Sequence, residues 1–422
     1  MGKYEKLIEE LYARHQSVQT AGFNSDSYKP GLERMESLSA QMGYPSNDFR
    51  SIHVAGTNGK GSVCSMLASS LAASGLSVGL FTSPHLMDFR ERVKIIGDDG
   101  FSLIGKDDVV EFVQSFNTDG LSFFEFTTGL AFWYFSKMQV DIAVIEVGLG
   151  GLLDSTNIIV PELSVVTSIG LDHCAVLGNT VAEIAGQKAG IFKPGVPALV
   201  GCCDDEVSFV FEAVASREHC PLFFAEDWDV PEIEGMDLRG DYQQENLRTV
   251  IAALDLLGED VHEDAIAHAA VRTDLCGRWE TVGTAPLTIA DIGHNPPALK
   301  ENFAQLDRMI ASGKYSGLTI VYGIMADKDL AGIVPLMPRG ADYIFVTPGT
   351  PRAMKAGKIL DFFLSVRDRS SFGSAVALES FDQLPAALSE TAAARSDSLV
   401  YVGGSTFVVA DYVKLCKKCE KK

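Results

Sequence analysis

The sequence predicts an α/β protein with two domains, each built on a largely parallel sheet covered by helices on both faces. Three observations carry this prediction. The chain has 422 residues, 46% of them hydrophobic, which is more than one core normally needs. Short continuous apolar runs recur along it, as expected for strands buried on both faces of a sheet. Segments with helical spacing of their apolar residues alternate with these runs, which is the rhythm of a parallel α/β sheet.

The elements of the first domain follow in order. Apolar residues at helical spacing predict helices over 3–14 and 32–42, and the polar stretch 24–30 between them is expected to be a loop. The apolar run 51–55 predicts a strand, which a glycine-rich turn joins to a helical pattern over 63–74. Further strands are predicted at 78–82, 142–147, 163–169 and 198–201.

The second domain shows the same alternation. Its strands are predicted at 287–292, 318–322, 343–346 and 399–402, with helix-like segments between them. The change from one series to the other falls between Gly277 and Pro286, which gives domains over 1–282 and 286–422.

The charge balance excludes two classes of partner. Lys and Arg number 35 against 56 Asp and Glu, a net charge of −21. Nucleic acid and anionic membranes are bound through a field of positive charge, so neither is expected as a partner. The apolar stretches are too short to span a bilayer, and the N-terminal residues show no secretory signal. Eight cysteines are too few for a disulfide framework in a chain of this length, and we expect a cytoplasmic protein.

A glycine-rich loop lies where the first strand passes into a helix. Residues 53–62 read His-Val-Ala-Gly-Thr-Asn-Gly-Lys-Gly-Ser. Backbone N–H groups and the positive end of the helix dipole converge at such a turn and favour a phosphate. A plain turn would not require the lysine, which supplies a point charge. We therefore expect a nucleotide phosphate site made by Gly56, Thr57, Asn58, Gly59, Lys60, Gly61 and Ser62.

Two polar residues follow buried strands of the same domain. Glu146 lies near the end of the strand 142–147, and His173 follows the strand 163–169. In open α/β sheets, ligands bind at the carboxyl ends of the strands. A carboxylate, an imidazole and a hydroxyl suit a Mg²⁺ that also keeps waters and nucleotide phosphates. Alone, Glu146 could simply be solvated and His173 could be a satisfied loop histidine, but three such groups at successive strand ends indicate a metal site.

The sequence AGTNGKGS at 55–62, together with GLFTSPHL at 79–86, resembles the folylpolyglutamate synthase branch of the Mur-ligase family. Members of this family make amide bonds from a carboxylate, an amine and ATP. Other Mur-type ligases usually place Ser or Thr directly after the lysine, whereas this branch has Lys-Gly-Ser. The resemblance implies a P-loop-containing parallel-sheet ATPase domain that binds ATP and folate, followed by a smaller Rossmann-like α/β domain that acts as the glutamate-ligase domain.

The resemblance also implies roles for single residues near the phosphates. Mg²⁺ would be held by Ser83, Glu146 and His173. Lys188 matches a lysine that is often carbamylated in the family and then helps a second Mg²⁺. The residues implied to be catalytic are Lys60, His173, Lys188 and Arg278. The ATP site would be completed by Asn246 on the adenine side, Arg278 at the phosphates, Asp291 near the ribose and His294 near the phosphates.

Two further segments resemble the substrate side of the family. Residues 123–128, Phe-Phe-Glu-Phe-Thr-Thr, match a segment near the pterin, where aromatic rings stack and a carboxylate accepts hydrogen bonds. A buried helix start with core phenylalanines is the alternative interpretation. Residues 150–157 resemble the family's mobile loop. The implied substrate contacts are Phe123, Phe124, Glu125, Leu153, Asp154 and Ser155.

The resemblance implies a monomeric ATP-dependent ligase that adds L-glutamate to a reduced folate through an acyl phosphate. Dihydropteroate is left open as a second acceptor, because 27–34 lack the acidic residue typical of bifunctional members. Two other interpretations stay open. One is a different amino-acid ligase of the same superfamily. The other is a nucleotide-binding protein that has lost catalysis, which the family departures at Leu152, Gln187 and Tyr242 would fit.

Overall fold

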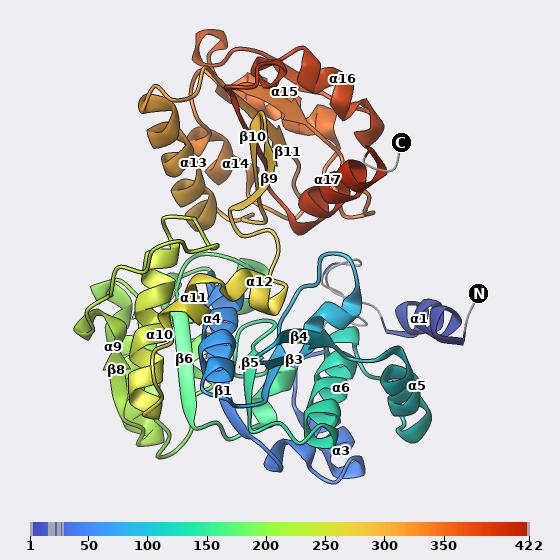
Figure 1. Ribbon diagram of the computed structural model, residues 1–422, viewed down its shortest axis with the longest axis vertical. Coiled ribbons are helices and arrows are strands. Elements are labelled where there is room, and N and C mark those ends of the chain that lie inside the picture. The colour runs from blue at the N-terminus through green and yellow to red at the C-terminus, as the bar shows by residue number, and fades with distance from the viewer. Residues whose placement is uncertain (1–2, 16–21, 23–26, 28, 420–422) are drawn as a thin grey trace. The chain divides into compact units, whose positions relative to one another are not determined.

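The computed structural model describes residues 3–15, 22, 27 and 29–419 (Figure 1). Of the loop expected over 24–30, only Ser27, Lys29 and Pro30 are therefore described, and the following helix begins at Glu33. No helix in the described part of the chain is long and apolar enough to cross a membrane.

The chain divides into two compact units. Unit 1 comprises Met1–Leu238 and Gln243–Leu275, and unit 2 comprises Arg239–Tyr242 and Cys276–Lys422. Residues 276–282, which we placed in the first domain, thus belong to unit 2. The physical reason is that β9 (Glu280–Thr284) pairs with β10 (Leu287–Asp291) in the second sheet.

The sheet of unit 1 has the strand order β4-β3-β2-β5-β1-β6-β7-β8. All neighbours from β2 to β8 pair in parallel, whereas β3 and β4 add antiparallel pairs at one edge. The strands span β1 (Arg50–Ala55), β2 (Val78–Phe81), β3 (Val93–Gly97), β4 (Gly100–Leu103), β5 (Ile142–Glu146), β6 (Leu163–Ser168), β7 (Ala198–Cys202) and β8 (Leu222–Phe224).

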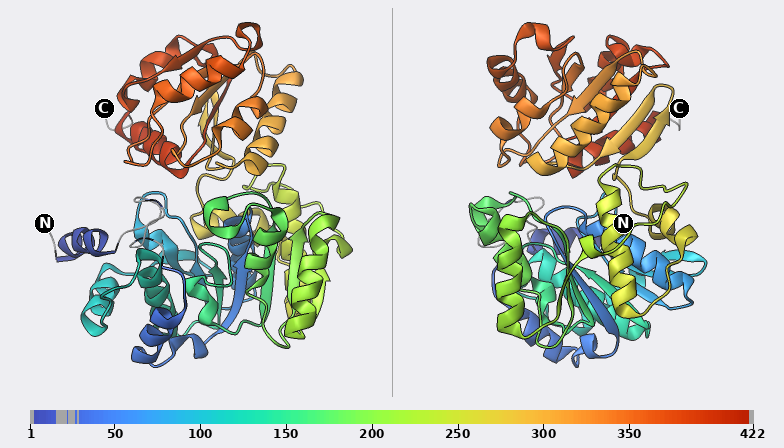
Figure 2. Two further views of the ribbon diagram at one scale, coloured as in Figure 1. Left: turned by 180° about the vertical axis from the view of Figure 1, so that it is seen from behind. Right: turned by 90° about the vertical axis from the view of Figure 1, so that its left-hand side faces the viewer.

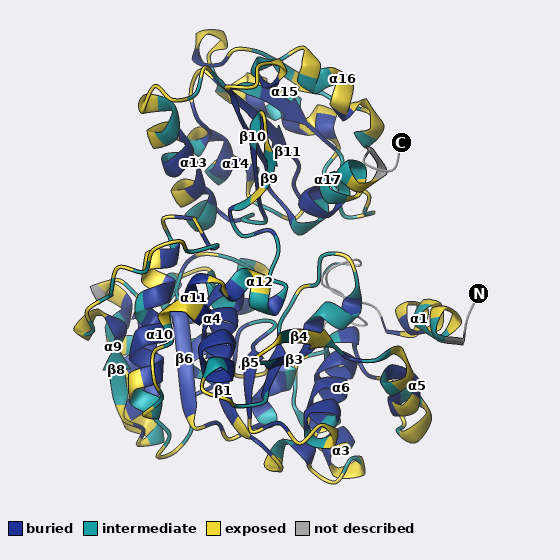
Figure 3. Ribbon diagram, viewed as in Figure 1, coloured by how far each residue is buried: buried dark blue, intermediate teal, exposed yellow. Residues whose placement is uncertain are grey.

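Central strands of this sheet are buried on both faces (Figure 3). In β5, Ile142 and Val144 pack into one core, while Ala143 and Ile145 pack into the core on the opposite face. Side chains of a strand alternate between the two faces, so a strand covered on both sides must be apolar throughout. This explains the continuous apolar runs, and the strands predicted from those runs in both domains are confirmed.

Helices cover both faces of the sheet of unit 1 (Figure 2). On one face, α4 packs against the strands and is itself covered by α10, α11 and α12. The other face is covered by α3 and α6, with α1 and α5 beside them, and by α8 and α9. The bounds are α1 (Lys3–Arg14), α3 (Glu33–Gln41), α4 (Lys60–Ala73), α5 (Lys106–Ser115), α6 (Phe123–Lys137), α7 (Cys174–Leu177), α8 (Val181–Ala189), α9 (Asp205–Glu218), α10 (Gln243–Leu257), α11 (Glu263–Ala267) and α12 (Ala269–Thr273).

Helix α4 begins earlier than the sequence pattern indicated. The apolar spacing predicted a helix from residue 63, but the first helical residue is Lys60. The first turn carries Gly61 and Ser62, which are buried without adding to the apolar pattern. The glycine-rich loop (residues 56–62) therefore runs directly into the N-terminus of this helix.

Unit 2 has a sheet with the order β13-β12-β11-β14-β10-β9, in which β9 is antiparallel. One face packs on α13 and α15, and the other on α16 and α17. The remaining bounds are β11 (Leu318–Tyr322), β12 (Asp342–Phe345), β13 (Ala375–Ala377), β14 (Leu399–Gly403), α13 (Pro296–Ala311), α14 (Leu330–Ile333), α15 (Ala356–Val366), α16 (Leu384–Ser389) and α17 (Thr406–Cys419). Two α/β units of unequal size confirm the predicted fold class.

The packing of α10 against the sheet can be tested with two Val→Ala changes in helices of unit 1. Val250 on α10 is 0% exposed, whereas Val271 on α12 is 72% exposed. Val250→Ala should lower the free energy of unfolding by about 2 kcal/mol, because buried methyl groups and their packing are lost. Val271→Ala should change it by less than about 0.5 kcal/mol. Urea unfolding followed by circular dichroism measures both, and equal losses would contradict the packing described.

Candidate active site

The loops that follow β2, β5, β1 and β6 lie at one edge of the sheet of unit 1. These strands are neighbours and run parallel, so their carboxyl ends meet at that edge. Ligands of open α/β sheets bind there. The predicted site residues of unit 1 lie at or after these strand ends. They are the glycine-rich loop, Ser83, Glu146 and His173.

Two positions of the loop require glycine because neighbouring side chains leave no room for a Cβ atom. A Cβ on Gly56 would lie 1.9 Å from Thr167 Oγ1, and a Cβ on Gly59 would lie 2.2 Å from Asn246 Oδ1. Gly59 also has φ 86°, in the left-handed region that favours glycine. It is the N-cap of α4 and brings no capping side chain, so the first-turn N–H groups stay available to an anion.

The loop is fixed in place by the end of β6. The amide of Thr57 donates to the carbonyl of Ser168 at 2.7 Å, and the amide of Asn58 donates to the Ser168 hydroxyl at 3.1 Å. The hydroxyl of Thr167 donates to the Asn58 carbonyl at 2.6 Å. Sequence reasoning did not single out Thr167 and Ser168, although two adjacent hydroxyl residues ending an apolar strand are a usable signal.

Two lysine ammonium groups converge on one carbonyl of the loop. Lys60 Nζ donates to the carbonyl of Gly56 at 2.9 Å, and Lys188 Nζ, from α8, donates to the same oxygen at 2.7 Å. Lys188 is only 4% exposed, so it is not the surface lysine that its position near a helix end could suggest. Burial, and then the charge of Lys60, lower the pKa of Lys188 from 10.5 to about 7. Two ammonium groups beside a helix N-terminus suit a polyphosphate.

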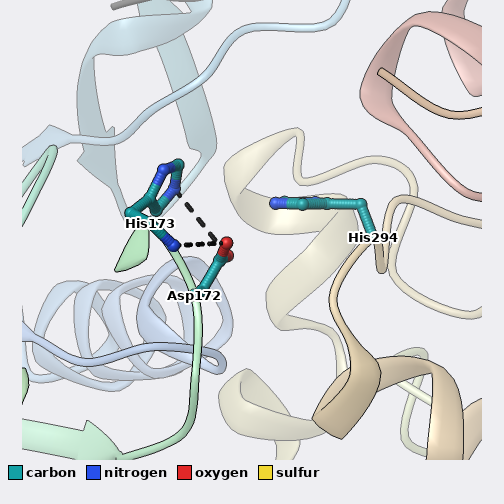
Figure 4. A group of neighbouring side chains, drawn as sticks. All are labelled: Asp172, His173 and His294. Atoms are coloured by element: carbon teal, nitrogen blue, oxygen red, sulfur yellow. Dashed lines mark hydrogen bonds and ion pairs between the residues drawn. The ribbon is translucent and has the colours of Figure 1, made fainter. Parts of the chain in front are cut away.

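The expected metal ligands are partly brought together. The amide of Ser83 donates to Glu146 Oε2 at 2.9 Å, which places the serine beside the buried carboxylate. His173 lies on the loop after β6, and its Nε2 is 3.7 Å from Asp172 Oδ2 (Figure 4). Asp172, which was not among the expected ligands, adds a carboxylate on this loop to the Glu146 carboxylate at the end of β5. A hydroxyl, carboxylates and an imidazole fit the ligand preferences of Mg²⁺ in a nucleotide site.

The aromatic residues that begin α6 are packed among other side chains. The ring of Phe123 stacks on Tyr12 with centroids 5.3 Å apart, and the Arg92 guanidinium lies 5.3 Å from the same ring. Phe124 is half-buried, and a Cβ on Gly148 would meet its ring at 2.4 Å. Phe124 thus contacts the turn that follows Glu146.

Glu125 has a structural role that the resemblance did not indicate. Its carboxylate accepts from the amide of Ser122 at 2.7 Å, completing a capping box, and from Arg34 Nε at 2.8 Å. The side chain is buried. The position of Glu125 therefore fits the alternative interpretation, a buried helix start. A contact between Glu125 and the substrate stays a prediction.

The loop after Glu146 is shaped by Asp154. This buried carboxylate accepts from the hydroxyl of Thr156 at 2.5 Å and from its amide at 3.0 Å, and burial raises the Asp154 pKa. Ser155 begins a short 3-10 turn that Asp154 caps. Leu152, at the family's arginine position, and Leu153 are both exposed. The exposed part of this loop is therefore apolar.

Asn246 lies directly against Gly59 and is also linked to the glycine-rich loop through Gln243. Its Nδ2 donates to Gln243 Oε1 at 2.7 Å, and Gln243 Nε2 donates to the Ser62 hydroxyl at 3.1 Å. Both residues lie in the first turns of α10. Sequence reasoning had placed Asn246 on the adenine side but had not connected Gln243 with Ser62.

Three of the expected ATP residues lie in unit 2. The Arg278 guanidinium donates to the carbonyls of Cys276 and Gly277 at 3.2 and 3.4 Å, and it forms no salt bridge with a carboxylate of the described residues. His294 Nδ1 is 3.0 Å from the carbonyl of Ile292, in the loop between β10 and α13. Asp291, the last residue of β10, is buried and accepts several hydrogen bonds within unit 2.

The buried ammonium group of Lys188 predicts a specific pH dependence of stability. Its folded pKa lies below its unfolded value, so the unfolded chain binds more protons between about pH 7 and 10, and the free energy of unfolding rises with pH there. Lys188→Met removes this contribution. The stability of the variant relative to the wild type should be greatest at or below about pH 7 and fall toward pH 10.

Urea unfolding of both proteins in bicarbonate-free buffers across this pH range measures the effect. Lys6→Met, at an exposed position of α1, is the control and should differ from the wild type by a constant amount. A pH-independent difference for Lys188→Met would contradict the shifted pKa.

Comparisons with known proteins show which family the chain belongs to. Two protein-family models match the chain, "Mur ligase middle domain" over residues 54–267 and "Mur ligase, glutamate ligase domain" over residues 277–406. A folylpolyglutamate synthase from Lacticaseibacillus casei is 36% identical over 76% of this chain and 82% of its own. A dihydrofolate synthase/folylpolyglutamate synthase from Bacillus subtilis is 30% identical over 92% and 95%.

Another relative is longer than this chain. A probable bifunctional folylpolyglutamate synthase/dihydropteroate synthase from Haloferax volcanii is 34% identical over 91% of this chain, which spans only 48% of that relative.

Solved structures show the same fold. E. coli FolC in complex with DHPP and ADP has a TM-score of 0.82 at 29% identity, covering 99% of both chains. The bifunctional folylpolyglutamate synthase/dihydrofolate synthase from Yersinia pestis, complexed with AMPPNP and Mn ion, has a TM-score of 0.80 at 26% identity, covering 99% of this chain and 98% of that one. From its matched domains, its relatives and its fold, the chain belongs to the folylpolyglutamate synthase/dihydrofolate synthase branch of the Mur ligase family and is an ATP-dependent ligase of that type.

Proposed function

We propose that this ligase adds L-glutamate to the γ-carboxylate of a reduced folate, with ATP as the energy source. One observation carries the proposal. Lys60 and Lys188 meet on the carbonyl of Gly56 at the N-terminus of α4, on the same sheet edge as the Ser83–Glu146 pair. That arrangement suits a nucleotide polyphosphate and its metal. The identities of the proposed acceptor, a folate, and of the amino acid, glutamate, come from the names of the relatives.

The nucleotide phosphates would bind the amides of the glycine-rich loop and the ammonium group of Lys60. Ser83, Glu146 and His173 offer the donor types that Mg²⁺ takes, and the relative from Yersinia pestis crystallised with AMPPNP and Mn ion supports a divalent metal. When bound, Mg²⁺ neutralises phosphate charge. Asn246 and His294 keep the adenine-side and phosphate-side roles that the resemblance implies, as proposals.

The reaction proceeds in two steps. A carboxylate oxygen of the acceptor attacks the γ-phosphorus of ATP, which gives an acyl phosphate and ADP. The amine nitrogen of L-glutamate then attacks the acyl carbon, loses a proton, and expels inorganic phosphate to leave an amide. Negative charge shifts between oxygens during phosphoryl transfer, so Lys60 acts by charge stabilisation. Arg278, which has no carboxylate partner among the described residues, is proposed to do the same.

The two units would divide the work. Unit 1 is proposed to bind ATP and the folate, and unit 2, which contains the matched glutamate ligase domain, to serve the incoming amino acid. The proposed contacts with the folate are Phe123, Phe124, Glu125, Leu153, Asp154 and Ser155. A monomeric state and a cytoplasmic location also stay predictions.

Carbamylation of Lys188 is chemically favoured by its environment. A pKa of about 7 leaves much of the amine neutral at neutral pH, and the neutral amine is the form that adds to carbon dioxide. The adduct would replace a cation with an anion beside Gly56. A carbamate carbon signal in ¹³C NMR with ¹³C-bicarbonate, present in the wild type and absent in Lys188→Met, would support it. No such signal in the wild type would refute it.

The acceptor is identified by measuring ADP release with Mg²⁺, ATP and L-glutamate. Dihydropteroate, tetrahydrofolate and no acceptor are compared in parallel, with Lys60→Ala as the control that should lose turnover while keeping its circular dichroism spectrum. Turnover with tetrahydrofolate alone indicates a folylpolyglutamate synthase, and turnover with both indicates a bifunctional enzyme. ADP release only with another carboxylate and amino acid would favour a different Mur-type ligase. ADP binding without turnover would favour a protein that has lost catalysis.

The glycine-rich loop itself is tested by a matched pair of Gly→Ala changes. Gly59 and Gly75 flank α4 with φ of 86° and 88°, but only a Cβ on Gly59 meets another atom, Asn246 Oδ1. Both changes should therefore carry a similar backbone cost of about 1–2 kcal/mol. Gly59→Ala should in addition weaken ADP binding by about tenfold or more, because the loop must move. Isothermal titration calorimetry would contradict this if both variants bound ADP equally.

A further inference from the structure

We propose that Asp291 is a positioning residue that fixes both chain segments connecting unit 2 to unit 1, and through them two groups of the nucleotide site. The inference rests on the proposed function. The chain passes between the units at 238/239, 242/243 and 275/276. We call residues 239–242 and 276–279 the connecting segments. Both belong to unit 2, and each lies next to a point where the chain passes to unit 1. Each of them donates a hydrogen bond to the same carboxylate.

Asp291 accepts four hydrogen bonds. Oδ2 accepts from the Tyr242 hydroxyl and from the amide of Trp279, both at 2.9 Å. Oδ1 accepts from the amide of Gly293 and from Asn302 Nδ2, both at 2.7 Å. A carboxylate offers about four acceptor positions, so this one is fully used. The carboxylate is 3% exposed, and an unsatisfied buried charge would be costly, so the four donors are held together.

The four donors come from different parts of unit 2. Gly293 and Asn302 belong to the loop after β10 and to α13, which form the body of the unit. Tyr242 and Trp279 belong to the two connecting segments. The carboxylate therefore joins both connections to the body of unit 2.

The second connection is held in a strained conformation. Trp279 has φ 50°, which is unusual for a large residue, and its buried ring lies 6.1 Å from that of Tyr401. Such a backbone persists only where its surroundings fix it, here by the hydrogen bond to Asp291 and the burial of the ring. Arg278 precedes Trp279 and donates to the carbonyls of Cys276 and Gly277 in the same segment. Asp291 thus sets the position of the backbone that carries Arg278.

The first connection leads to the glycine-rich loop. Tyr242, fixed in unit 2 by Asp291, is followed directly by Gln243, the first residue of α10 in unit 1. The side chain of Gln243 donates to the Ser62 hydroxyl. Two adjacent residues are therefore anchored to Asp291 in one unit and to the loop in the other. Loss of the Tyr242 anchor would loosen the start of α10 and the residue that holds Ser62.

This role differs from the ribose contact that the family resemblance implies for Asp291. A ribose hydroxyl could bind the carboxylate only if one of the four present donors gave way. A positioning role needs no contact with the nucleotide, and it gives Tyr242, one of the departures from the family, a defined task.

The test compares two Tyr→Phe variants in the same buried network. Tyr242→Phe removes only the hydroxyl that donates to Asp291. Tyr401→Phe removes a buried hydroxyl that accepts from Asn302 at 3.0 Å, and it keeps the ring that lies beside Trp279. Tyr242→Phe should raise the dissociation constant for ADP and the KM for ATP about five- to tenfold, because a hydrogen bond to a charged group is lost. Tyr401→Phe should lower the melting temperature while leaving both constants as in the wild type.

Hydrogen–deuterium exchange gives a readout that does not depend on activity. Tyr242→Phe should speed amide exchange over residues 240–246, and Tyr401→Phe should not. Nucleotide constants for Tyr242→Phe equal to those of Tyr401→Phe, with exchange unchanged, would overturn the inference. If the wild type bound no ADP, the proposed function would fail. The exchange data alone would then support or overturn the claim that Asp291 fixes the connecting segments.

Discussion

The parallel pairing of β1 with β5 and β6 is the constraint on which the candidate site depends. The register sets Val54 of β1 opposite Glu146, the last residue of β5, and opposite Val165 of β6, and β6 continues past the end of β1 to Ser168. The glycine-rich loop can then be fixed by Thr167 and Ser168, and Ser83 can donate to Glu146. Because both faces of these strands are buried, a slip of one residue would expose the wrong side chains to each core.

Concentrated positive charge inside an acidic chain gives the site its chemistry. The protein has a net charge of −21, yet Lys60 and Lys188 meet on one carbonyl. Asp172 and Asp154 partly offset the resulting depression of the Lys188 pKa. Burial is the largest cause of this depression, and it leaves Lys188 near its titration point at neutral pH.

Local patterns predicted what depends on local sequence. Central strands were found because burial on both faces makes them continuously apolar, whereas β3, β4, β8, β9 and β13 were missed, since they lie at or beside sheet edges. Phe101 of β4 and Val376 of β13, for example, are both substantially exposed. The glycine-rich loop, Ser83 and Glu146 were recognised from short motifs. The burial of Lys188, the use of Glu125 in a capping box, and the placement of 239–242 in unit 2 depend on long-range packing, which no local pattern encodes.

The central claim is that this site transfers the γ-phosphoryl group of ATP to a carboxylate, and isotope transfer tests it most directly. A folate whose γ-carboxylate carries ¹⁸O would be ligated to L-glutamate, and the inorganic phosphate would be examined by ³¹P NMR or mass spectrometry. An acyl phosphate requires one carboxylate oxygen to leave with the phosphate, so the account predicts ¹⁸O in the product phosphate. Phosphate without ¹⁸O, formed together with the amide, would contradict it.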